Sequence, residues 1–555
     1  MNRDVEPGRW GPAASAHSEH SKHSKHSESS GLDPRTRTFA ETRLGPAVSA
    51  PPPGQPLISA PRLSVEQLAE MFPGIEVATD DDTRMRASRG MSYANMVSWR
   101  SDREHRAPDA VVSPASHDEA LAVVGACSAA GIACVPVGGG TSVTGGIDTP
   151  VFTAVIAVST DRLNAIEDFD EESAVVTVGS GVTGPALEEY LGARGWTLGH
   201  FPQSYERASV GGYIAARSSG QSSSGYGRIE DMLVAADVAT PIGSWTVGGY
   251  PASSSGPDLR HVVLGSEGSL GVVTRAQLRV KRAPSVREYR AALVPGGFDS
   301  AVRVVQQLAR SPLRPTVLRV SDSAETEALL TMSMPSGLVG RAFSAYVRAR
   351  RALPGSLVIL GFEADREETV RASRAFASDV LADAGAISLG SRPGKSWVAG
   401  RFHGPYLRDA LMDGGYLVET FETVVLWSEV DEVHRILSDV ARRELGDSSY
   451  VMAHISHSYD VGASLYFTVL AGGWNDPDAA ATAWRRVKST LMDVIRESGA
   501  AVSHHHGVGR DHRDWLAGQV GDLGIGVLRS VKAYLDPAGV MNPGALLDSG
   551  ERGVP

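Results

Sequence analysis

The sequence predicts an α+β protein with at least two domains. Its 555 residues are enough for roughly two to four domains of ordinary size. Segments with strand-like and helical spacing follow one another along two long stretches, and Gly-rich loops separate the strands of the first stretch. The chain contains 60 Gly residues, which favours many tight turns and close backbone approaches.

The composition argues against several classes of protein. Hydrophobic residues make up 42% of the chain and charged residues 21%, as in soluble globular proteins. A net charge of −11 disfavours a nucleic-acid partner, because phosphates bind to basic surfaces. Cys127 and Cys134 are too few for a disulfide framework, and no apolar run reaches the roughly 18 residues of a membrane helix. Since a signal-peptide core is also missing, we expect a cytoplasmic protein.

Residues 1–61 are predicted to be a disordered tail. Histidine recurs at every third position from His17 to His26, and a Pro-rich stretch follows at 51–56. Neither segment can bury enough apolar surface to offset the entropy lost on ordering. We therefore expect this tail to be dispensable for activity.

Residues 62–285 are predicted to form a first α+β domain. Its clearest element is an amphipathic helix over 117–130, with Ser116 as the N-cap and Gly131 at its end. Further helices are expected over 63–71 and 185–193, and strands over 109–114, 132–137, 151–158, 174–179, 233–240 and 271–280.

Residues 286–500 are predicted to form a second α+β domain. The spacing predicts helices over 299–309, 366–384 and 478–498, and strands over 316–320, 357–363 and 463–470. The remaining segment, 501–555, is rich in Gly and His at its start and is expected to be helical over 526–534.

The first motif with chemical content directly follows the strand at 132–137. Three successive glycines, Gly138 to Gly140, allow backbone N–H groups to turn inward around an anion, and Thr141 and Ser142 add hydroxyl donors. The order of glycines differs from the G-x-G-x-x-G fingerprint of Rossmann folds. A pyrophosphate-binding loop is the favoured interpretation, and a merely flexible loop is the alternative.

Two more Gly-rich segments follow in the same region. Residues 202–227 are small and polar but include Tyr205, Glu206 and Arg217, and residues 265–273 lead from a turn into an apolar strand. Each segment is a weak signal alone. Three such loops in one domain favour a binding site for a large phosphorylated cofactor.

Together these loops resemble the FAD domain of the vanillyl-alcohol oxidase/p-cresol methylhydroxylase (PCMH-type) flavoproteins. The resemblance covers about 105–548, and within the family it is strongest to the branch of the alkylglycerone-phosphate synthases. The segments that carry this stronger resemblance occur in family order: 199–202, 226–231, 256–258, 459–467 and 503–509.

The resemblance implies a two-domain PCMH-type fold: an FAD-binding domain over 62–285, an α+β cap over 286–500 and a C-terminal helical segment, 501–555, that returns to the FAD domain. It implies noncovalent FAD, because Thr141 stands where histidine-linked relatives carry the histidine that bonds to the flavin. The family commonly has Asp where this chain has Gln203. The implied cofactor-binding residues are Pro136, Val137, Gly138, Gly139, Gly140, Thr141, Ser142, Gln203, Ser204, Tyr205, Glu206, Arg207, Ala208, Ser209, Ala216, Arg217, Ser218, Ser219, Glu267, Gly268, Ser269, Leu270, Gly271, Val272 and Val273.

The same resemblance implies catalytic roles for Tyr466, His505 and His506. It also implies that Arg408 and Arg319 bind a substrate phosphate, for which a guanidinium fork is suited. From the residues alone, Tyr466 could equally pack in the core, and Arg408 could be a surface charge.

The run His504-His505-His506 leaves a metal site open as an alternative, with His454 and His457 as a second cluster. Three adjacent side chains do not easily converge on one ion, so we expect no metal.

The activity implied by the resemblance exchanges the acyl group of acyl-dihydroxyacetone phosphate for a fatty alcohol through an adduct at flavin N5. Two alternatives stay open. One is an FAD-dependent dehydrogenase or oxidase of a 2-hydroxy acid, such as D-lactate or glycolate, or of another alcohol. The other is a noncatalytic flavin- or lipid-binding protein. A small-molecule or lipid substrate is expected, and peripheral membrane contact and a homodimer stay open.

Overall fold

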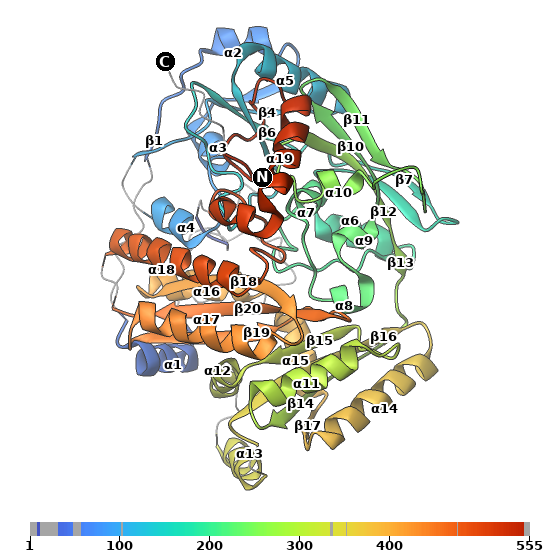
Figure 1. The fold of residues 1–555 in the computed structure, drawn as a ribbon, viewed down its shortest axis with the longest axis vertical. Helices are drawn as coiled ribbons and strands as arrows, with labels where there is room; N and C mark the ends of the chain where they lie inside the picture. Colours follow the sequence, from blue (N-terminus) through green and yellow to red (C-terminus); the bar gives the residue numbers. More distant parts are fainter. Residues whose placement is uncertain are drawn as a thin grey trace.

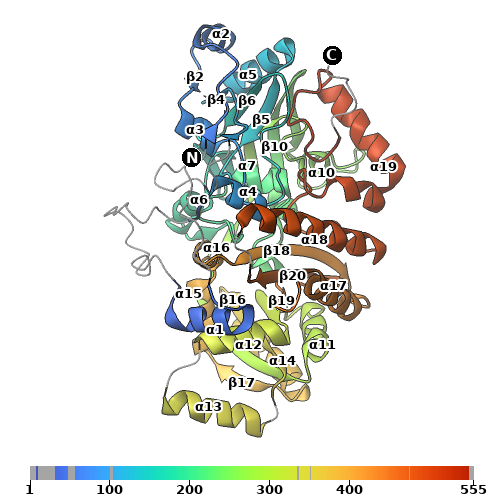
Figure 2. The same ribbon diagram turned by 90° about the vertical axis from the view of Figure 1, so that its left-hand side faces the viewer.

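The computed structural model describes residues 8–10, 32–47, 57–100, 104–333, 337–350, 352–473 and 476–548. Figures 1 and 2 show two halves: a first domain with the C-terminal helix, and a second domain built on one large sheet. The predicted α+β class is confirmed. No helix in the described ranges is long and apolar enough to cross a membrane.

The first domain contains two main sheets. A four-stranded sheet has the order β2-β4-β6-β5, with β2 antiparallel and the other strands parallel. A five-stranded antiparallel sheet has the order β11-β10-β12-β8-β7. The bounds of these strands are β2 (Glu76–Ala78), β4 (Ala110–Ser113), β6 (Val155–Ser159), β5 (Ala133–Val137), β11 (Gly243–Gly248), β10 (Leu233–Thr240), β12 (Val272–Arg279), β8 (Val175–Gly179) and β7 (Ile166–Asp170).

Helix α5 (His117–Ala130) joins the two sheets. Ser116 caps its N-terminus, and Gly131 ends it in the left-handed conformation, as the sequence predicts. Its buried face packs with Ala239 of β10 and Val272 of β12. The other helices are α2 (Val65–Met71), α3 (Asp81–Arg86), α4 (Tyr93–Trp99), α6 (Gly184–Gly192), α7 (Val210–Ala216), α8 (Ser223–Tyr226), α9 (Ile229–Met232) and α10 (Arg260–Val263), and short strands pair as β1 (Leu57–Ile58) with β3 (Glu104–His105) and β9 (Trp196–Thr197) with β13 (Lys281–Arg282).

The second domain is built on a seven-stranded antiparallel sheet of order β17-β14-β16-β15-β19-β20-β18. Its strands are β14 (Val286–Pro295), β15 (Val317–Ser321), β16 (Gly355–Ala364), β17 (Ile387–Gly390), β18 (Leu417–Leu426), β19 (Ser449–Ile455) and β20 (Gly462–Ala471). Its helices are α11 (Phe298–Ala309), α12 (Ser323–Ser333), α13 (Leu338–Ala349), α14 (Glu367–Asp383), α15 (Arg392–Gly400), α16 (Gly404–Asp413), α17 (Val430–Leu445) and α18 (Pro477–Glu497).

The chain then returns to the first domain. Helix α19 (Arg513–Leu535) lies on the outer surface of that domain (Figure 2). After it, residues 540–542 run beside β5, where the Cys134 N–H donates to the Val540 carbonyl at 2.8 Å and the Asn542 N–H donates to the Cys134 carbonyl at 2.8 Å. The Asn542 side chain donates to the Gly146 and Glu267 carbonyls at 2.8 and 2.6 Å. The C-terminal segment therefore packs against β5 and two Gly-rich loops that lie far earlier in the chain.

The expectation of a disordered tail is wrong for part of residues 1–61. Helix α1 (Pro34–Leu44) begins at an Asp33 cap and buries Phe39, Ala40 and Leu44 in the core of the second domain. Two N-terminal residues are also fixed: the Arg9 guanidinium pairs with Asp413, and the Trp10 N–H donates to Asp409 at 2.6 Å. The helix has few apolar residues, and the biased composition of the neighbouring residues concealed it. The repeat from His17 to His26 and the Pro-rich 51–56 stretch lie outside the described residues.

The tail is therefore not expected to be dispensable as a whole. Phe39→Ala should lower the free energy of unfolding by about 3–5 kcal/mol, because it removes a buried ring that packs edge-on against Tyr450. Urea unfolding of the full chain measures this effect. Arg37→Ala, on the exposed face of the same helix, is the matched control and should change stability by less than about 0.5 kcal/mol. Equal effects of the two variants would contradict the packing of α1.

Candidate active site

The three Gly-rich loops of the first domain converge in the structure. A Cβ added at Gly139 would lie 2.0 Å from the Arg207 carbonyl oxygen, and one at Gly138 would lie 2.4 Å from the Ser209 hydroxyl. A Cβ at Gly268 would lie 2.9 Å from the ring of Pro136. The loops at 136–142, 203–209 and 265–273 therefore need glycine because they touch one another.

The phosphate loop, Pro136 to Ser142, presents a row of free donors. Within the described part of the chain, the backbone N–H groups of residues 138–142 donate to no other protein group. These residues are half-buried, and Gly140 has a φ of +68°, which turns the backbone inward. A concave row of N–H groups fits an anion such as the pyrophosphate of FAD.

The second loop contributes less to this concavity than the sequence suggests. Ser209 caps α7, and Ala208 is buried. The side chains of Gln203, Tyr205, Glu206 and Arg207 contact the second domain and the N-terminal segment: Gln203 donates to the Arg401 carbonyl at 2.9 Å, Tyr205 stacks on Phe402, Glu206 accepts from Tyr406 at 2.8 Å, and Arg207 donates to the Arg9 carbonyl at 3.0 Å. Apart from the backbone, this loop mainly joins the two domains.

Residues 216–219 connect the loops to the C-terminal segment. Arg217 ends α7 with a φ of +52° and pairs with Glu230. The Ser218 hydroxyl is 2.7 Å from His200 Nε2, and the Ser219 hydroxyl accepts from Arg228. Arg228 also donates to the His504 carbonyl at 2.9 Å, which holds the loop beside the histidine run.

The third loop, residues 265–273, contacts the C-terminal segment through Glu267 and buries several of its other side chains. The Glu267 carboxylate accepts from the N–H groups of Val508 and Gly509 at 3.0 and 2.7 Å, and its burial raises the pKa of this carboxyl to about 7. Ser269 is also buried, and its hydroxyl donates to the Ser266 carbonyl. The side chains of Leu270, Val272 and Val273 are buried in the protein core, where they have a structural role.

The histidine turn, Ser503 to Gly509, brings His505 and His506 beside Tyr466. The ring centroid of Tyr466 lies 5.8 Å from that of His505 and 5.6 Å from that of His506. Burial lowers the pKa of His505 to about 3 and that of His506 to about 4, and it raises the pKa of Tyr466 to about 12. All three groups are therefore neutral at pH 7, and each can accept or donate a proton.

Both arginines lie near this cluster. Arg408, on α16, pairs with Glu419 at 3.2 Å and donates to the Met91 carbonyl at 2.9 Å. Arg319, on β15, pairs with Glu325 at 2.9 Å and lies 3.0 Å from Nδ1 of His454, whose ring stacks on Tyr466. Both arginines are mostly buried, unlike ordinary surface charges.

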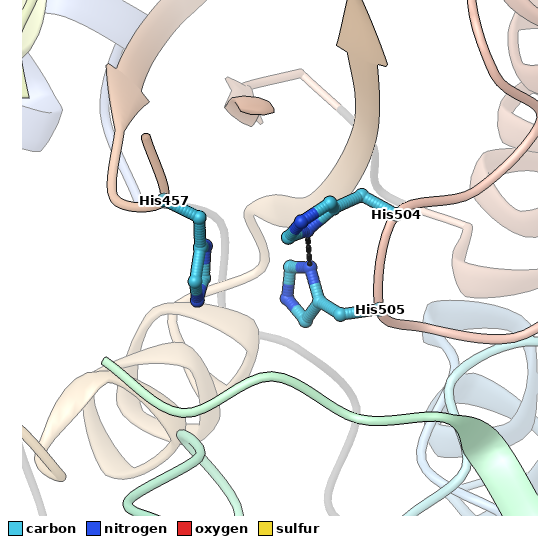
Figure 3. Close-up of side chains that lie close together, drawn as sticks. All are labelled: His457, His504 and His505. Carbon is cyan, nitrogen blue, oxygen red and sulfur yellow. Dashed lines mark hydrogen bonds between the residues drawn. The ribbon is translucent and has the colours of Figure 1, made fainter. Parts of the chain in front are cut away.

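Two histidines of the same turn, His504 and His505, form a group with His457 (Figure 3). Ring nitrogens of His457, His504 and His505 lie within 4.8 Å of one another. Hydrogen bonds already engage them: His504 Nδ1 lies 2.9 Å from His505 Nδ1, His504 Nε2 lies 2.6 Å from the Tyr459 hydroxyl, and His457 Nε2 lies 3.0 Å from the Gly220 carbonyl. A metal ion here would have to displace these bonds. His454 is not part of the group and lies instead beside Tyr466.

Sequence reasoning missed several residues of this site. Glu422 and Glu419 are buried and belong to none of the segments that carry the family resemblance. Arg228 and His200 lie in two of those segments, 226–231 and 199–202, but the sequence assigned them no role. The partners of Glu422 lie far away in the sequence, 81 to 84 positions later. Tyr459 lies in the 459–467 segment, but its contact with His504 could not be predicted from spacing.

The class of protein follows from these features. A half-buried row of backbone donors fits a dinucleotide pyrophosphate, and a cluster of neutral proton-transfer groups lies between that domain and a second one. This combination defines an FAD-binding enzyme of the two-domain kind.

Comparison with known proteins identifies the family. Residues 108–249 match the FAD binding domain, and residues 283–546 match the C-terminal domain of FAD linked oxidases. The chain is 32% identical over 518 residues to alkyldihydroxyacetonephosphate synthase of Trypanosoma brucei brucei, across 91% of this chain and 83% of that protein. A solved alkyldihydroxyacetonephosphate synthase structure has 29% identity and a TM-score of 0.78, with 92% of each chain covered. The chain belongs to the alkyldihydroxyacetonephosphate synthase family of FAD-linked oxidases.

The fold is shared more widely. A p-cresol methylhydroxylase structure aligns with a TM-score of 0.66 at 16% identity, covering 85% of this chain and 94% of that one. This likeness concerns the fold alone, and it confirms the PCMH-type architecture that the sequence predicts.

Proposed function

We propose that this enzyme exchanges the acyl group of acyl-dihydroxyacetone phosphate for a fatty alcohol, giving the alkyl ether and a free fatty acid. The observation that carries the proposal is the grouping of Tyr466, His505 and His506 in one cluster. Arg319 lies beside His454, which stacks on Tyr466, and Arg408 is close enough to influence the pKa of Tyr466 and of His506. Relatives at this level of identity are named for the same synthase activity. The net reaction is an exchange and needs no electron acceptor.

The side chains in the cluster would move protons and stabilise charge. FAD, when bound, supplies a ring nitrogen that can act as a nucleophile. The neutral imidazoles of His505 and His506 would accept protons, and the Tyr466 hydroxyl would act as acid or base beside the substrate ketone. Burial on both sides of the cluster would exclude water, which favours alcohol over water as the entering group.

Arg408 is the favoured partner for the substrate phosphate. Its three hydrogen bonds to Glu419, Met91 and Val418 leave N–H groups on both terminal nitrogens, and a guanidinium suits a phosphate dianion. Arg319 is the second candidate, although its pairing with Glu325 and His454 holds it beneath Tyr466.

Arg408→Ala should raise the KM for the phosphorylated substrate by about 10- to 100-fold, the usual effect of losing a hydrogen bond to a charged group. A phosphate contact acts in both the ground state and the transition state, so kcat should change less than KM. Steady-state kinetics with a phosphorylated substrate and its phosphate-free analogue measure the effect. If both substrates suffer equally, Arg408 acts only by holding Glu419 and the Met91 carbonyl.

The competing proposal is a dehydrogenase or oxidase of a 2-hydroxy acid, because the same FAD loops suit that chemistry. An isotope experiment separates the two. The FAD-loaded enzyme is given palmitoyl-dihydroxyacetone phosphate and hexadecanol labelled with ¹⁸O. We expect the label in the ether oxygen of the product and unlabelled palmitate. Absence of an ether product, with oxidation of D-lactate in a parallel sample, would favour the dehydrogenase.

We also propose a cytoplasmic enzyme in peripheral contact with a lipid membrane, since the substrates of the proposed reaction carry long alkyl chains. Support comes from α19, where the side chains of Leu523 and Tyr534 are 89% and 74% exposed. Tyr534 also lines a cavity of about 630 Å³, together with Ile242, Trp245, Leu259 and Val531. Leu523→Asp should reduce flotation of the protein with phosphatidylcholine vesicles. A homodimer through this face, detected by ultracentrifugation without vesicle binding, would contradict the proposal.

A further inference from the structure

We propose that Glu422 is the positioning residue for His505 and His506, and that its charge supports the proton that one of them takes up in the reaction. The proposal rests on the function proposed above for the two histidines. Glu422 is outside the motifs that the sequence singles out, and it lies on β18 of the second domain, whereas the FAD loops lie in the first.

Glu422 lies on β18, directly opposite Tyr466 on β20. Its carboxylate faces the histidine turn and accepts hydrogen bonds from a complete row of donors. Oε1 accepts from the Ser503 hydroxyl at 2.8 Å and from the N–H groups of His504, His505 and His506 at 3.0, 3.2 and 3.1 Å. Oε2 accepts from the His504 N–H at 2.8 Å. One side chain therefore fixes the backbone under all three histidines.

The same carboxylate lies close to the two imidazoles. Nδ1 of His505 is 3.7 Å from Oε2, and Nδ1 of His506 is 3.8 Å from Oε1, while the Glu422 side chain has no exposed surface. Burial opposes ionisation of Glu422, whereas a positive charge on His505 or His506 and the row of hydrogen-bond donors favour it, so that the pKa of this carboxyl is lowered. A carboxylate at this distance stabilises whichever ring becomes an imidazolium, as a carboxylate does beside a catalytic histidine.

The turn is also fixed at its far end. Glu267 of the first domain accepts from the N–H groups of Val508 and Gly509. Two buried carboxylates, one from each domain, thus hold the two ends of one turn. The positions of His505 and His506 between the FAD loops and Tyr466 depend on both, but only Glu422 lies beside their rings.

Two substitutions separate holding the turn from supplying the charge. In Glu422→Gln, the amide oxygen can occupy the Oε1 position and keep the bonds from residues 503–506, while the charge is lost. In Glu422→Ala, both the bonds and the charge are lost. Asp322→Asn is the matched control, because Asp322 is another buried acid of this domain that accepts backbone N–H groups, from Glu325 and Ala453, without touching the turn.

The FAD-loaded full chain is tested by hydrogen exchange of the peptide that contains residues 503–507, and by steady-state kinetics. Glu422→Ala should speed the exchange of these amides by about 10- to 100-fold. Glu422→Gln should leave the exchange close to that of the unaltered enzyme, yet lower kcat by roughly 100-fold with little change in KM. Asp322→Asn should change neither the exchange of this peptide nor kcat.

Two results would overturn the proposal. Unchanged amide exchange in Glu422→Ala would show that the carboxylate does not hold the turn. A kcat of Glu422→Gln equal to that of the unaltered enzyme would show that its charge plays no part. If the unaltered enzyme forms no ether product, the proposed function fails, and the exchange measurement alone then decides whether Glu422 positions the histidines.

Discussion

Tyr466→Phe should lower kcat by about 100- to 10,000-fold while FAD stays bound, because it removes a proton-transfer group and leaves the ring in place. The ring of Tyr466 lies next to the rings of His505 and His506, and the phenyl ring left by the substitution can still stack on His454. His506→Ala should have an effect of the same order. The measurement is the initial rate of ether formation, together with the flavin content of each variant.

Tyr450→Phe is the matched control, because Tyr450 is another tyrosine of the same sheet whose hydroxyl bonds to Glu327 and Ala324 outside the cluster. It should retain nearly full activity. A wild-type rate for Tyr466→Phe would contradict a catalytic role and leave Tyr466 as a packing residue of β20. Loss of FAD from the same variant would instead show that the residue supports the cofactor.

Gly139→Ala should abolish FAD binding. The added Cβ would lie 2.0 Å from the Arg207 carbonyl oxygen and 2.8 Å from Ala208 Cα, which are backbone atoms that cannot move aside as a side chain can. The phosphate loop and the loop at 203–209 must then separate, and the row of N–H groups at 138–142 loses its shape. Flavin absorbance of the purified protein, after incubation with excess FAD, measures the effect.

Gly125→Ala provides the control. Gly125 is in the middle of α5, and nothing lies within 4 Å of an added Cβ, so this change should leave FAD binding intact. Full FAD content in Gly139→Ala would show that the phosphate loop does not hold the cofactor as proposed.

FAD bound to the unaltered protein should be released by acid precipitation, since Thr141 offers no ring nitrogen for a covalent bond.

The sequence predicted those helices and strands that are determined by residues close to them in the chain. Helix α5 has its cap, its apolar face and its terminal glycine within sixteen residues, and the structure has all three where the sequence predicts them. The strand expected over 233–240 coincides with β10. The turn of the glycine loop after β5 was predictable for the same reason, because its glycines and the preceding strand are adjacent in the chain, while its role in holding the pyrophosphate stays a prediction.

Elements that depend on partners far away in the sequence were not predictable. Strand β18 carries Glu419 and Glu422 in an apolar run, and these acids obscure its pattern. They are tolerated because Arg408 and the histidine turn satisfy them, and only the fold brings those partners together. The same holds for residues 203–207, whose sequence resembles a cofactor loop. In the structure, the side chains of Gln203, Tyr205 and Glu206 contact residues almost 200 positions later, namely Arg401, Phe402 and Tyr406.

The central claim, a redox-neutral exchange, is tested most directly by an anaerobic reaction of the FAD-loaded enzyme without any electron acceptor. Palmitoyl-dihydroxyacetone phosphate and hexadecanol are added in excess, and the flavin spectrum, the ether and the released palmitate are followed together. We expect many turnovers, one palmitate for each ether, and a flavin spectrum at the end equal to that at the start. Lasting reduction of the flavin by D-lactate, with no ether formed from the lipid substrates, would contradict the account.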